Sequence, residues 1–153
     1  MINIVLYSPE IPQNTGNISR TCAVTGARLH IIKPIGFEIS DRTLKRAGLD
    51  YWDKLDVTYY ENYEDFLRQN EKANLYFFSA HAEHSFAEVE YPEDVYLVFG
   101  RESVGLPEEL VRENIDRALR IPMRKTLRCL NLSNSVAIAT YEVLRQRSYG
   151  GLE

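Results

Sequence analysis

The chain has 153 residues, 44% of them hydrophobic and 26% charged, which is the composition of a globular protein and excludes a fibrous or largely disordered one. This length fits one domain that buries roughly two thirds of the surface its unfolded chain exposes. Because no apolar run approaches the roughly 20 residues of a membrane helix and the first residues lack a basic segment, we expect a single cytoplasmic domain over residues 1–153 without a membrane span.

Apolar or β-branched strand patterns alternate with helical patterns along the chain. The expected elements, in chain order, are a strand at 2–7, a helix at 12–25, a strand at 28–33, a short helix at 40–48, a strand at 57–60, a helix at 62–72, strands at 75–79 and 95–99, a helix at 107–113, a strand at 118–121 and a helix from 131 or 133 to 147. This alternation predicts an α/β fold, in which helices cover both faces of a parallel sheet.

Polar residues and a glycine mark the ends of two of these helices. Asn14 or Thr15 is expected to cap the first helix, and Gly26 to end it. Asn131 or Ser133 is expected to cap the last helix.

The motifs of several common enzyme classes do not occur in the sequence, including the dinucleotide-binding, Walker A, serine-hydrolase and zinc-protease motifs. His81 and His84 have no third ligand nearby, so we interpret them as exposed loop residues and expect no metal site. His30 is expected in the core or at a sheet edge. Cys22 and Cys129 are too few for a disulfide framework and are interpreted as buried or pocket-lining thiols.

The charge is unevenly distributed around a formal net charge of −4. Ten acidic residues lie between Asp56 and Asp94. Basic residues gather elsewhere, at Arg42, Lys45 and Arg46 and at Arg117, Arg120, Arg124, Lys125 and Arg128. A polyanion responds to the local field, so one basic face is enough to bind nucleic acid. The alternative interpretation is a solvated, charged surface.

Two strand patterns stop abruptly in loops that suit a ligand. Residues 97–107 read Leu-Val-Phe-Gly-Arg-Glu-Ser-Val-Gly-Leu-Pro, and residues 121–135 read Ile-Pro-Met-Arg-Lys-Thr-Leu-Arg-Cys-Leu-Asn-Leu-Ser-Asn-Ser. In open α/β sheets, ligands bind outside the carboxyl ends of the strands, where loops offer backbone N–H and C=O groups. The sequence therefore predicts a ligand site built from both loops.

Three segments together carry a resemblance to a known family. They are Pro-Gln-Asn-Thr-Gly-Asn-Ile-Ser-Arg-Thr-Cys (12–22), Phe-Gly-Arg-Glu-Ser-Val-Gly-Leu-Pro (99–107) and the stretch from Ile121 to Ala137, joined by Arg-Ala-Gly-Leu-Asp-Tyr at 46–51. In this order and at these separations, the chain resembles the SPOUT class of RNA methyltransferases. It is most similar to the small members that methylate the ribose 2′-oxygen of the wobble nucleotide in certain tRNAs.

The resemblance implies a site for S-adenosylmethionine, a deep trefoil knot through which the last helix is threaded, and an obligate homodimer. Periodicity alone would give an unknotted sheet, because true knots are rare. The residues implied to hold the cofactor are Phe78, Gly100, Gly105, Ile121, Met123, Cys129 and Leu130. Apolar residues of the first and last helices that are expected to meet the partner chain are Ile18, Val136, Tyr141 and Leu144.

The resemblance also implies catalytic roles. Arg20 would activate or stabilise the ribose hydroxyl, and electrostatic stabilisation suits so basic a group better than proton abstraction. Asn14 would hold the substrate or a loop, and Glu102 would orient Arg20 or its partners. Ser133 and Asn134 would fix the knot loop and approach the target nucleotide. The alternative makes Asn14 and Ser133 helix caps, Glu102 a surface acid and Arg20 a salt-bridge partner.

The implied nucleic-acid partner is the tRNA anticodon stem-loop. The residues expected to contact its phosphates, from either subunit, are Lys45, Arg46, Arg124, Lys125 and Arg128. The chain departs from the family at Val104, Leu127 and Cys129, where relatives often carry basic or polar residues. Two other functions stay open: methylation of another tRNA or rRNA position, and a cofactor-binding or assembly module without catalysis.

Overall fold

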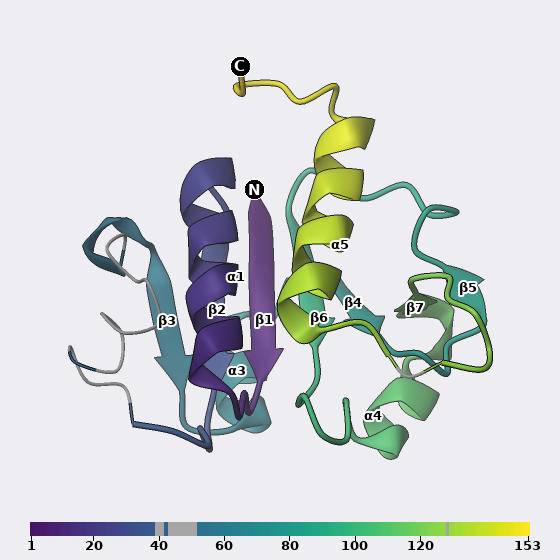
Figure 1. Cartoon of the computed structure of the whole chain (residues 1–153), viewed down its shortest axis with the longest axis horizontal. Coiled ribbons are helices and arrows are strands. Elements are labelled where there is room, and N and C mark those ends of the chain that lie inside the picture. Colours follow the sequence, from purple (N-terminus) through teal and green to yellow (C-terminus); the bar gives the residue numbers. More distant parts are fainter. Residues whose placement is uncertain (39–41, 43–51, 128) are drawn as a thin grey trace.

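The computed structural model of the chain describes residues 1–38, 42, 52–127 and 129–153. The described residues form one parallel sheet with the strand order β3–β2–β1–β6–β4–β7–β5 (Figure 1). The strands are β1 (Ile2–Tyr7), β2 (Arg28–Ile32), β3 (Val57–Tyr60), β4 (Leu75–Phe78), β5 (His84–Ser85), β6 (Val95–Phe99) and β7 (Ala118–Arg120). The predicted parallel α/β sheet is confirmed.

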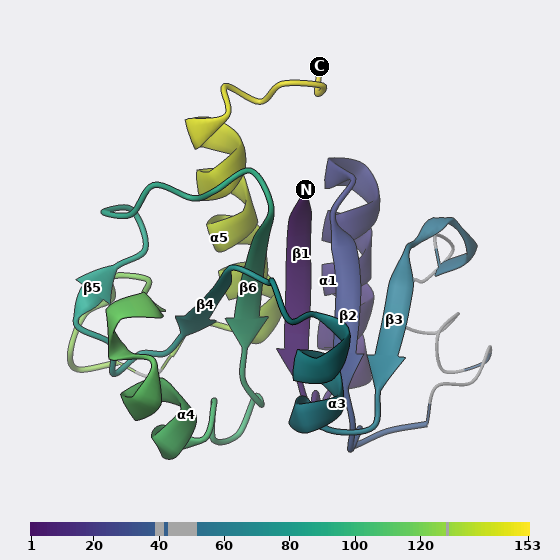
Figure 2. The same ribbon diagram turned by 180° about the vertical axis from the view of Figure 1, so that it is seen from behind.

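Helices cover both faces of this sheet, as predicted. The helices are α1 (Pro12–Thr25), α3 (Tyr63–Gln69), α4 (Glu108–Glu113) and α5 (Leu132–Gln146), with 3-10 turns at Trp52–Lys54 and Ile115–Arg117. Helices α1 and α5 lie side by side on one face and contact each other. Figure 2 shows α3 and α4 on the opposite side.

Successive side chains of β1 enter two different cores, because neighbouring residues of a strand point to opposite faces. Ile4 packs in a cluster with Ile18 of α1 and Val136 of α5. Val5 belongs to a second cluster with Phe66 of α3. Since β1 is buried on both faces, its sequence is a nearly continuous apolar run, as is usual in parallel sheets.

Helix α1 begins earlier than its predicted cap. Pro12 is its first residue, and Ile11 occupies the cap position without a side-chain hydrogen bond. Proline suits the first helical position because it has no N–H to satisfy. Asn14 and Thr15 are buried inside the helix, so the prediction that either of them caps it is wrong. Gly26 ends the helix as predicted, with a φ of 72° that favours glycine.

The last helix confirms one of its two predicted caps, because the side chain of Asn131 accepts the first N–H groups of α5. Strand β5 was not predicted. It has two residues that pair with Leu119 and Arg120 of β7, and so short a run has no periodicity to recognise. The helix expected at 40–48 lies outside the described residues, apart from Arg42, which is helical.

Three of the four residues expected to meet a partner chain are core residues, so that prediction is wrong for them. Ile18 and Val136 are fully buried, and Leu144 is 5% exposed. The apolar periodicity of α1 and α5 marks the face toward the sheet rather than an outer face. Tyr141 is 46% exposed and faces outward.

Of the two cysteines interpreted as buried or pocket-lining, Cys22 is confirmed as buried. Burial raises the pKa of its thiol to about 12. Cys129 is exposed, so its place in the lining of a pocket stays a prediction. His30 is a core residue, and His81 and His84 are exposed, all three as expected.

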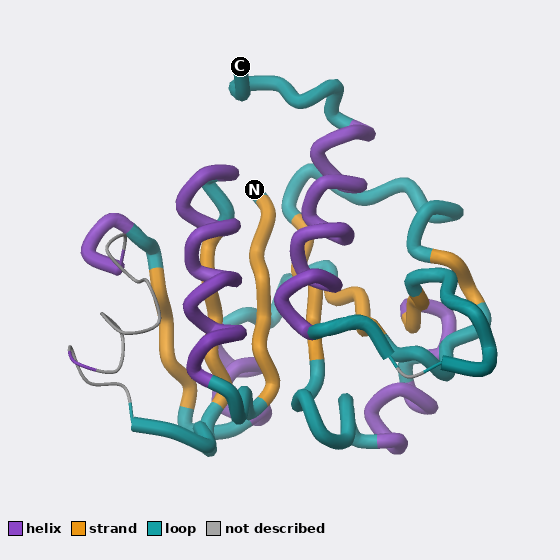
Figure 3. Tube along the Cα trace, in the orientation of Figure 1, coloured by secondary structure: helices purple, strands orange, loops and turns teal. Residues whose placement is uncertain are grey.

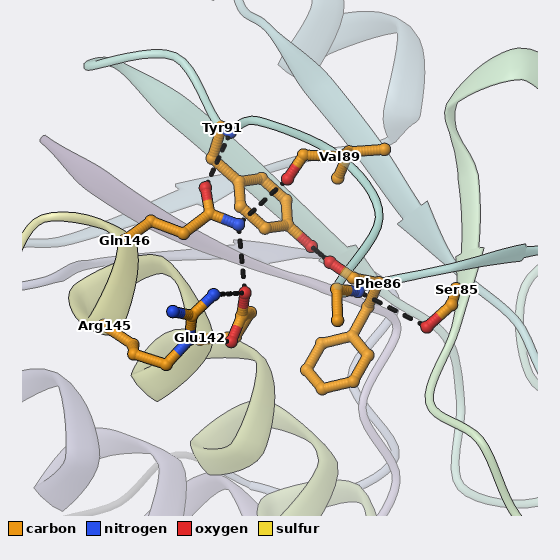
Figure 4. Close-up of polar contacts among 8 residues, drawn as sticks. Ser85, Phe86, Val89, Tyr91, Glu142, Arg145 and Gln146 are labelled. Atoms are coloured by element: carbon orange, nitrogen blue, oxygen red, sulfur yellow. Dashed lines mark hydrogen bonds and ion pairs between the residues drawn. The ribbon is translucent and has the colours of Figure 1, made fainter.

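The end of α5 is bonded to the connection between β5 and β6 (Figure 4). The side-chain amide of Gln146 donates to the carbonyl oxygen of Val89 at 2.9 Å and accepts the N–H of Tyr91 at 3.1 Å. Arg147 donates to the carbonyl oxygen of Pro92 at 2.9 Å. These bonds join the last helix to a segment far earlier in the chain. The knot itself stays a prediction.

Candidate active site

Two loops leave the sheet side by side at its carboxyl edge, where the strand arrows of Figure 1 end and Figure 3 shows connecting loops. Leu6 of β1 is paired with Phe99 of β6, so the loop at 8–11 and the loop at 100–107 start from neighbouring strands. The segment at 121–131 leads from β7 to α5, which packs against α1. The two predicted ligand loops follow β6 and β7. Both of these strands pair with β4 in the same direction, so the two loops leave the sheet at the same edge.

The carboxylate of Glu102 binds the start of α1. Its Oε2 accepts the N–H of Glu10 at 2.8 Å, and its Oε1 accepts the N–H of Ile11 at 3.0 Å and the Nδ2 of Asn14 at 3.4 Å. In the opposite direction, the carboxylate of Glu10 accepts the N–H of Ser103 at 3.1 Å and its hydroxyl at 2.9 Å. We call these reciprocal contacts the Glu10–Glu102 clamp.

A chain of side-chain amides continues from this clamp to α5. The Nδ2 of Asn131 donates to the Oδ1 of Asn14 at 2.9 Å. The Oδ1 of Asn131 accepts the N–H of Ser133 at 2.9 Å, its hydroxyl at 2.6 Å and the N–H of Asn134 at 3.3 Å. Asn14 is 5% exposed, so these partners are needed to satisfy its amide. The amide chain thus connects all three segments that carry the resemblance.

The two glycines of the β6–α4 loop are required by the loop itself. A Cβ on Gly100 would lie 2.1 Å from the backbone nitrogen of Leu106, and Gly105 has a φ of 72°. Arg101 and Gly105 exchange backbone hydrogen bonds of 3.2 and 2.9 Å, which close the loop. Glycine is therefore required at position 100 because the backbone of the same loop lies where a Cβ would be.

The predicted cofactor residues include an apolar, partly exposed set. Phe78 is largely buried and stacks on Phe99, with ring centroids 4.6 Å apart, at the carboxyl ends of β4 and β6. Ile121 is half-buried, Met123 is 37% exposed and Leu130 is 38% exposed. Among the described residues of 121–130, one backbone–backbone hydrogen bond forms, which leaves backbone groups available for a ligand. Apolar surface beside such groups suits a nucleoside.

Arg20 lies on the exposed side of α1, about 9 Å along the helix axis from Asn14. Arg124 and Lys125 are exposed in the segment before α5. The other expected RNA contacts, at Lys45, Arg46 and Arg128, lie outside the described residues. Val104 and Leu127, two of the positions where we expect the chain to depart from the family, are strongly exposed, by 74% and 70%.

Sequence reasoning missed three residues of this arrangement. Asn131 was expected to cap α5, but its second bond, to Asn14, joins two helices and leaves no local pattern. Glu10 and Ser103 form contacts between positions 93 residues apart, which no periodicity reveals. A signal existed only at Asn131, where a polar residue precedes an amphipathic helix.

A cavity of about 210 Å³ lies at the opposite, amino edge of the sheet. Its lining includes Met1, Cys22, Gly26, Arg28 and Asp56, and none of the predicted site residues. Within the described residues, no group of three or more His, Cys, Asp or Glu side chains is placed to hold a metal ion. In the same part of the chain, no helix is long and apolar enough to cross a bilayer.

The parallel sheet, its two helix layers and the loops at its carboxyl edge place the chain in the SPOUT class of α/β proteins. Residues 1–141 match the SpoU rRNA Methylase family, and the chain belongs to that family.

Individual relatives cover nearly the whole chain. The tRNA (cytidine(34)-2′-O)-methyltransferase of Escherichia coli K12 is 45% identical over 152 residues, which are 99% of this chain and 97% of the relative. A solved structure described as giving insights into the 2-OH methylation of C/U34 on tRNA is 45% identical, with a TM-score of 0.89 and 97% of each chain covered. The AdoMet-bound rRNA methyltransferase of Sinorhizobium meliloti is 26% identical, with a TM-score of 0.83, and the match covers 94% of this chain and 56% of that one.

Proposed function

We propose that this protein transfers a methyl group from S-adenosylmethionine to the ribose 2′-hydroxyl of nucleotide 34, the wobble position of a tRNA. One observation carries the proposal: 45% identity over 99% of the chain with an enzyme named for this reaction. The structure that concerns methylation of C/U34 supports cytidine or uridine as the base. The amide chain adds that all three segments of the resemblance meet at one edge of the sheet.

The cofactor site we propose consists of the loop at 100–106 and the segment at 121–130. S-adenosylmethionine supplies a methyl group on a positively charged sulfur. Met123 and Leu130 offer apolar surface for its nucleoside, and the surrounding backbone offers donors and acceptors. Phe78, stacked on Phe99, forms the apolar floor at the strand ends. The AdoMet-bound relative supports a site of this kind in the family.

In-line methyl transfer requires the ribose oxygen to lie directly opposite the sulfur, so the placement of the loops sets much of the rate. Asn14 donates to Glu102 and accepts from Asn131, which uses both ends of its amide. Ser133 donates its hydroxyl to Asn131. We therefore assign Asn14, Glu102 and Ser133 to holding the loops, and Asn134 to the side facing the target nucleotide because its side chain is exposed.

Arg20 is our candidate for the residue beside the reacting hydroxyl. A guanidinium stays protonated at any physiological pH, so it stabilises negative charge on the oxygen instead of removing the proton. Its side chain is exposed on α1, in the same helix as Asn14. Arg124 and Lys125, which are also exposed, are proposed contacts to RNA phosphates, together with Lys45, Arg46 and Arg128.

We further propose that two copies of the chain assemble through the outer sides of α1 and α5. These helices lie side by side, and Val24, Ile138 and Tyr141 remain 59%, 39% and 46% exposed. A second copy would remove this apolar surface from water. The threaded knot belongs to the same proposal, supported by the bonds of Gln146 and Arg147 to the segment before β6. A tRNA substrate favours a cytoplasmic location.

Methyl transfer to tRNA tests the function directly. Labelled S-adenosylmethionine is incubated with total tRNA from a strain that lacks the protein, and the modified position is mapped. We expect incorporation at nucleotide 34 with the wild-type protein and a loss of at least about a hundredfold with Arg20→Ala, since removing an electrostatic stabiliser costs on the order of 10²-fold. Incorporation at another position would support the alternative RNA target. No incorporation with either protein would support a binding module and overturn the enzyme.

A further inference from the structure

The two carboxylates of the Glu10–Glu102 clamp do different work. Glu102 gathers backbone N–H groups at the start of α1, whereas Glu10 reaches the opposite way to Ser103 in the β6–α4 loop. Glu10 thereby supplies the two bonds that hold Ser103, while Glu102 joins the neighbouring residue of the same loop to the start of α1.

The tip of the β6–α4 loop is exposed, although Leu106 at the end of the loop packs in the core cluster that contains Val5 and Phe66. Ser103 is exposed and Val104 is 74% exposed, so no core holds the tip of the loop. The bonds between Arg101 and Gly105 close the loop internally but do not attach its tip to the rest of the protein. That attachment comes from the carboxylates of Glu10 and Glu102.

The backbone on the Glu10 side of the clamp is firmly placed. The N–H of Gly36 donates to the carbonyl oxygen of Pro9 at 2.9 Å, and the N–H of Ser8 donates to that of Ile32 at 2.9 Å. A Cβ on Gly36 would come within 3.0 Å of the Cα of Glu10, which shows how closely this backbone is packed. Glu10 thus connects a fixed base to an exposed loop.

We propose that Glu10 is a positioning residue for methyl transfer: through Ser103 it holds the β6–α4 loop in the conformation that binds S-adenosylmethionine. The inference rests on the proposed function, because it takes that loop as part of the cofactor site. A loop that is already ordered binds its ligand more tightly, since the entropy of ordering it is not lost on binding. Glu10 itself need not touch the cofactor or the RNA.

The hydrogen-bond pattern predicts a difference between two conservative substitutions. In Glu10→Gln, the amide oxygen can accept the N–H of Ser103 while the amide NH₂ donates to the Ser103 hydroxyl, which can also accept. In Glu102→Gln, either orientation places the NH₂ against a backbone N–H, of Glu10 or of Ile11, and neither can accept. A glutamine can therefore keep the hydrogen bonds of Glu10 to Ser103, but it cannot keep those of Glu102 to the two backbone N–H groups.

Calorimetric titration with S-adenosylhomocysteine tests this positioning role without catalysis. We expect Glu10→Ala to weaken binding on the order of tenfold, Ser103→Ala by a smaller factor, and Glu10→Gln by less than about twofold. In steady-state assays, Glu10→Ala should raise KM for S-adenosylmethionine and leave kcat at saturation and KM for tRNA near the wild-type values. Thermal unfolding, measured in parallel, should be nearly unchanged because the contact is between surface loops.

Wild-type affinity for S-adenosylhomocysteine in Glu10→Ala would overturn the proposal, as would a fall in kcat without a rise in that KM. Equal losses in Glu10→Ala and Glu10→Gln would also overturn it, because the glutamine retains both bonds. If the alanine variant unfolds, Ser103→Ala and amide exchange at the Ser103 N–H in Glu10→Gln decide the matter. A wild-type protein that binds no S-adenosylhomocysteine and methylates no tRNA would instead refute the proposed function, which separates the two failures.

Discussion

At the scale of single residues, the site is organised by side chains that hold other residues in place. Asn131 has two functions: its oxygen caps α5, and its NH₂ group bonds to Asn14 of α1. Glu102 likewise gathers two backbone N–H groups and one amide. Polar residues of this kind are easily taken for catalytic groups, because Asn14 lies in the same motif as Arg20, the proposed catalytic residue.

The substitution Asn131→Asp separates the two functions of this residue. Aspartate keeps the cap and favours the positive end of the helix dipole, so α5 should remain as stable as in the wild type. In the wild type, the NH₂ group of Asn131 donates to the Oδ1 of Asn14 at 2.9 Å. Aspartate cannot donate, so two oxygens would face each other, and their repulsion would move the start of α5 away from α1. We expect methyl transfer to fall on the order of tenfold, which corresponds to about 1.4 kcal/mol.

The control for this substitution is Asn131→Ala, which loses both functions. It should reduce the free energy of unfolding by about 1 kcal/mol, the usual cost of a lost cap, and reduce activity as well. Urea unfolding and single-turnover methylation distinguish the variants. Full activity in a stably folded Asn131→Asp protein would show that the link between the two helices is dispensable.

At the scale of elements, a polar cluster joins β1, β2 and β3 to the end of α3. The Nδ1 of His30 lies 2.8 Å from the Tyr60 hydroxyl, and its Nε2 lies 3.1 Å from the Oδ1 of Asn3. Asn3 donates its NH₂ to Asp94, so its oxygen accepts and the proton of His30 belongs on Nε2. The Tyr60 hydroxyl then donates to Nδ1 and accepts from Asn70. Every position in this cluster suits a neutral imidazole.

This cluster predicts a dependence of stability on pH. Burial lowers the pKa of His30 from 6.5 to about 4 in the folded protein. Between these values the unfolded chain binds a proton that the folded protein does not, so stability is full above pH 6.5 and falls as the pH decreases toward 4. The loss should reach about 3 kcal/mol, since each pKa unit corresponds to about 1.36 kcal/mol.

Urea unfolding of the wild type and of His30→Gln at several pH values between 7 and 4 measures this contribution. The glutamine variant should be less stable at pH 7, because it loses the ring that packs against Phe66. Its stability should nevertheless fall less steeply over this range than that of the wild type. Parallel curves for the two proteins would assign the acid sensitivity to other groups.

The elements themselves were largely predictable, and the reason lies in how each is stabilised. The predicted bounds are correct for the helix at 12–25 and for the strands at 2–7, 57–60 and 95–99. Burial produces a local pattern of apolar residues in the sequence, and Gly26 marks the end of the helix. Strand β5 exists only because it pairs with β7, so its own sequence carries no signal. The contact of Glu10 with Ser103 depends likewise on the placement of two loops that the sheet brings together, and no local pattern encodes it.

At the scale of the whole molecule, the same periodicity that located the core misled the prediction of the partner surface. Ile18, Val136 and Leu144 pack against the sheet, so the outer side of α1 and α5 is formed by other positions. Ile138 and Tyr141 lie three residues apart on α5 and are both exposed, which places them on one outward side. This exposed apolar surface is where we propose that the second copy packs.

The substitution Ile138→Lys tests this assembly. A charge on the outer side of α5 should convert the proposed dimer into a monomer at micromolar concentration, because a buried, unpaired ammonium costs several kcal/mol at an interface. The matched control is Leu67→Lys, on α3 at the opposite face of the sheet. Leu67 is 38% exposed, which is close to the 39% of Ile138. Light scattering after size exclusion should give two chains per particle for the wild type and the control, and one for Ile138→Lys. A monomeric wild type, or a dimeric Ile138→Lys protein, would show that α1 and α5 do not form the interface.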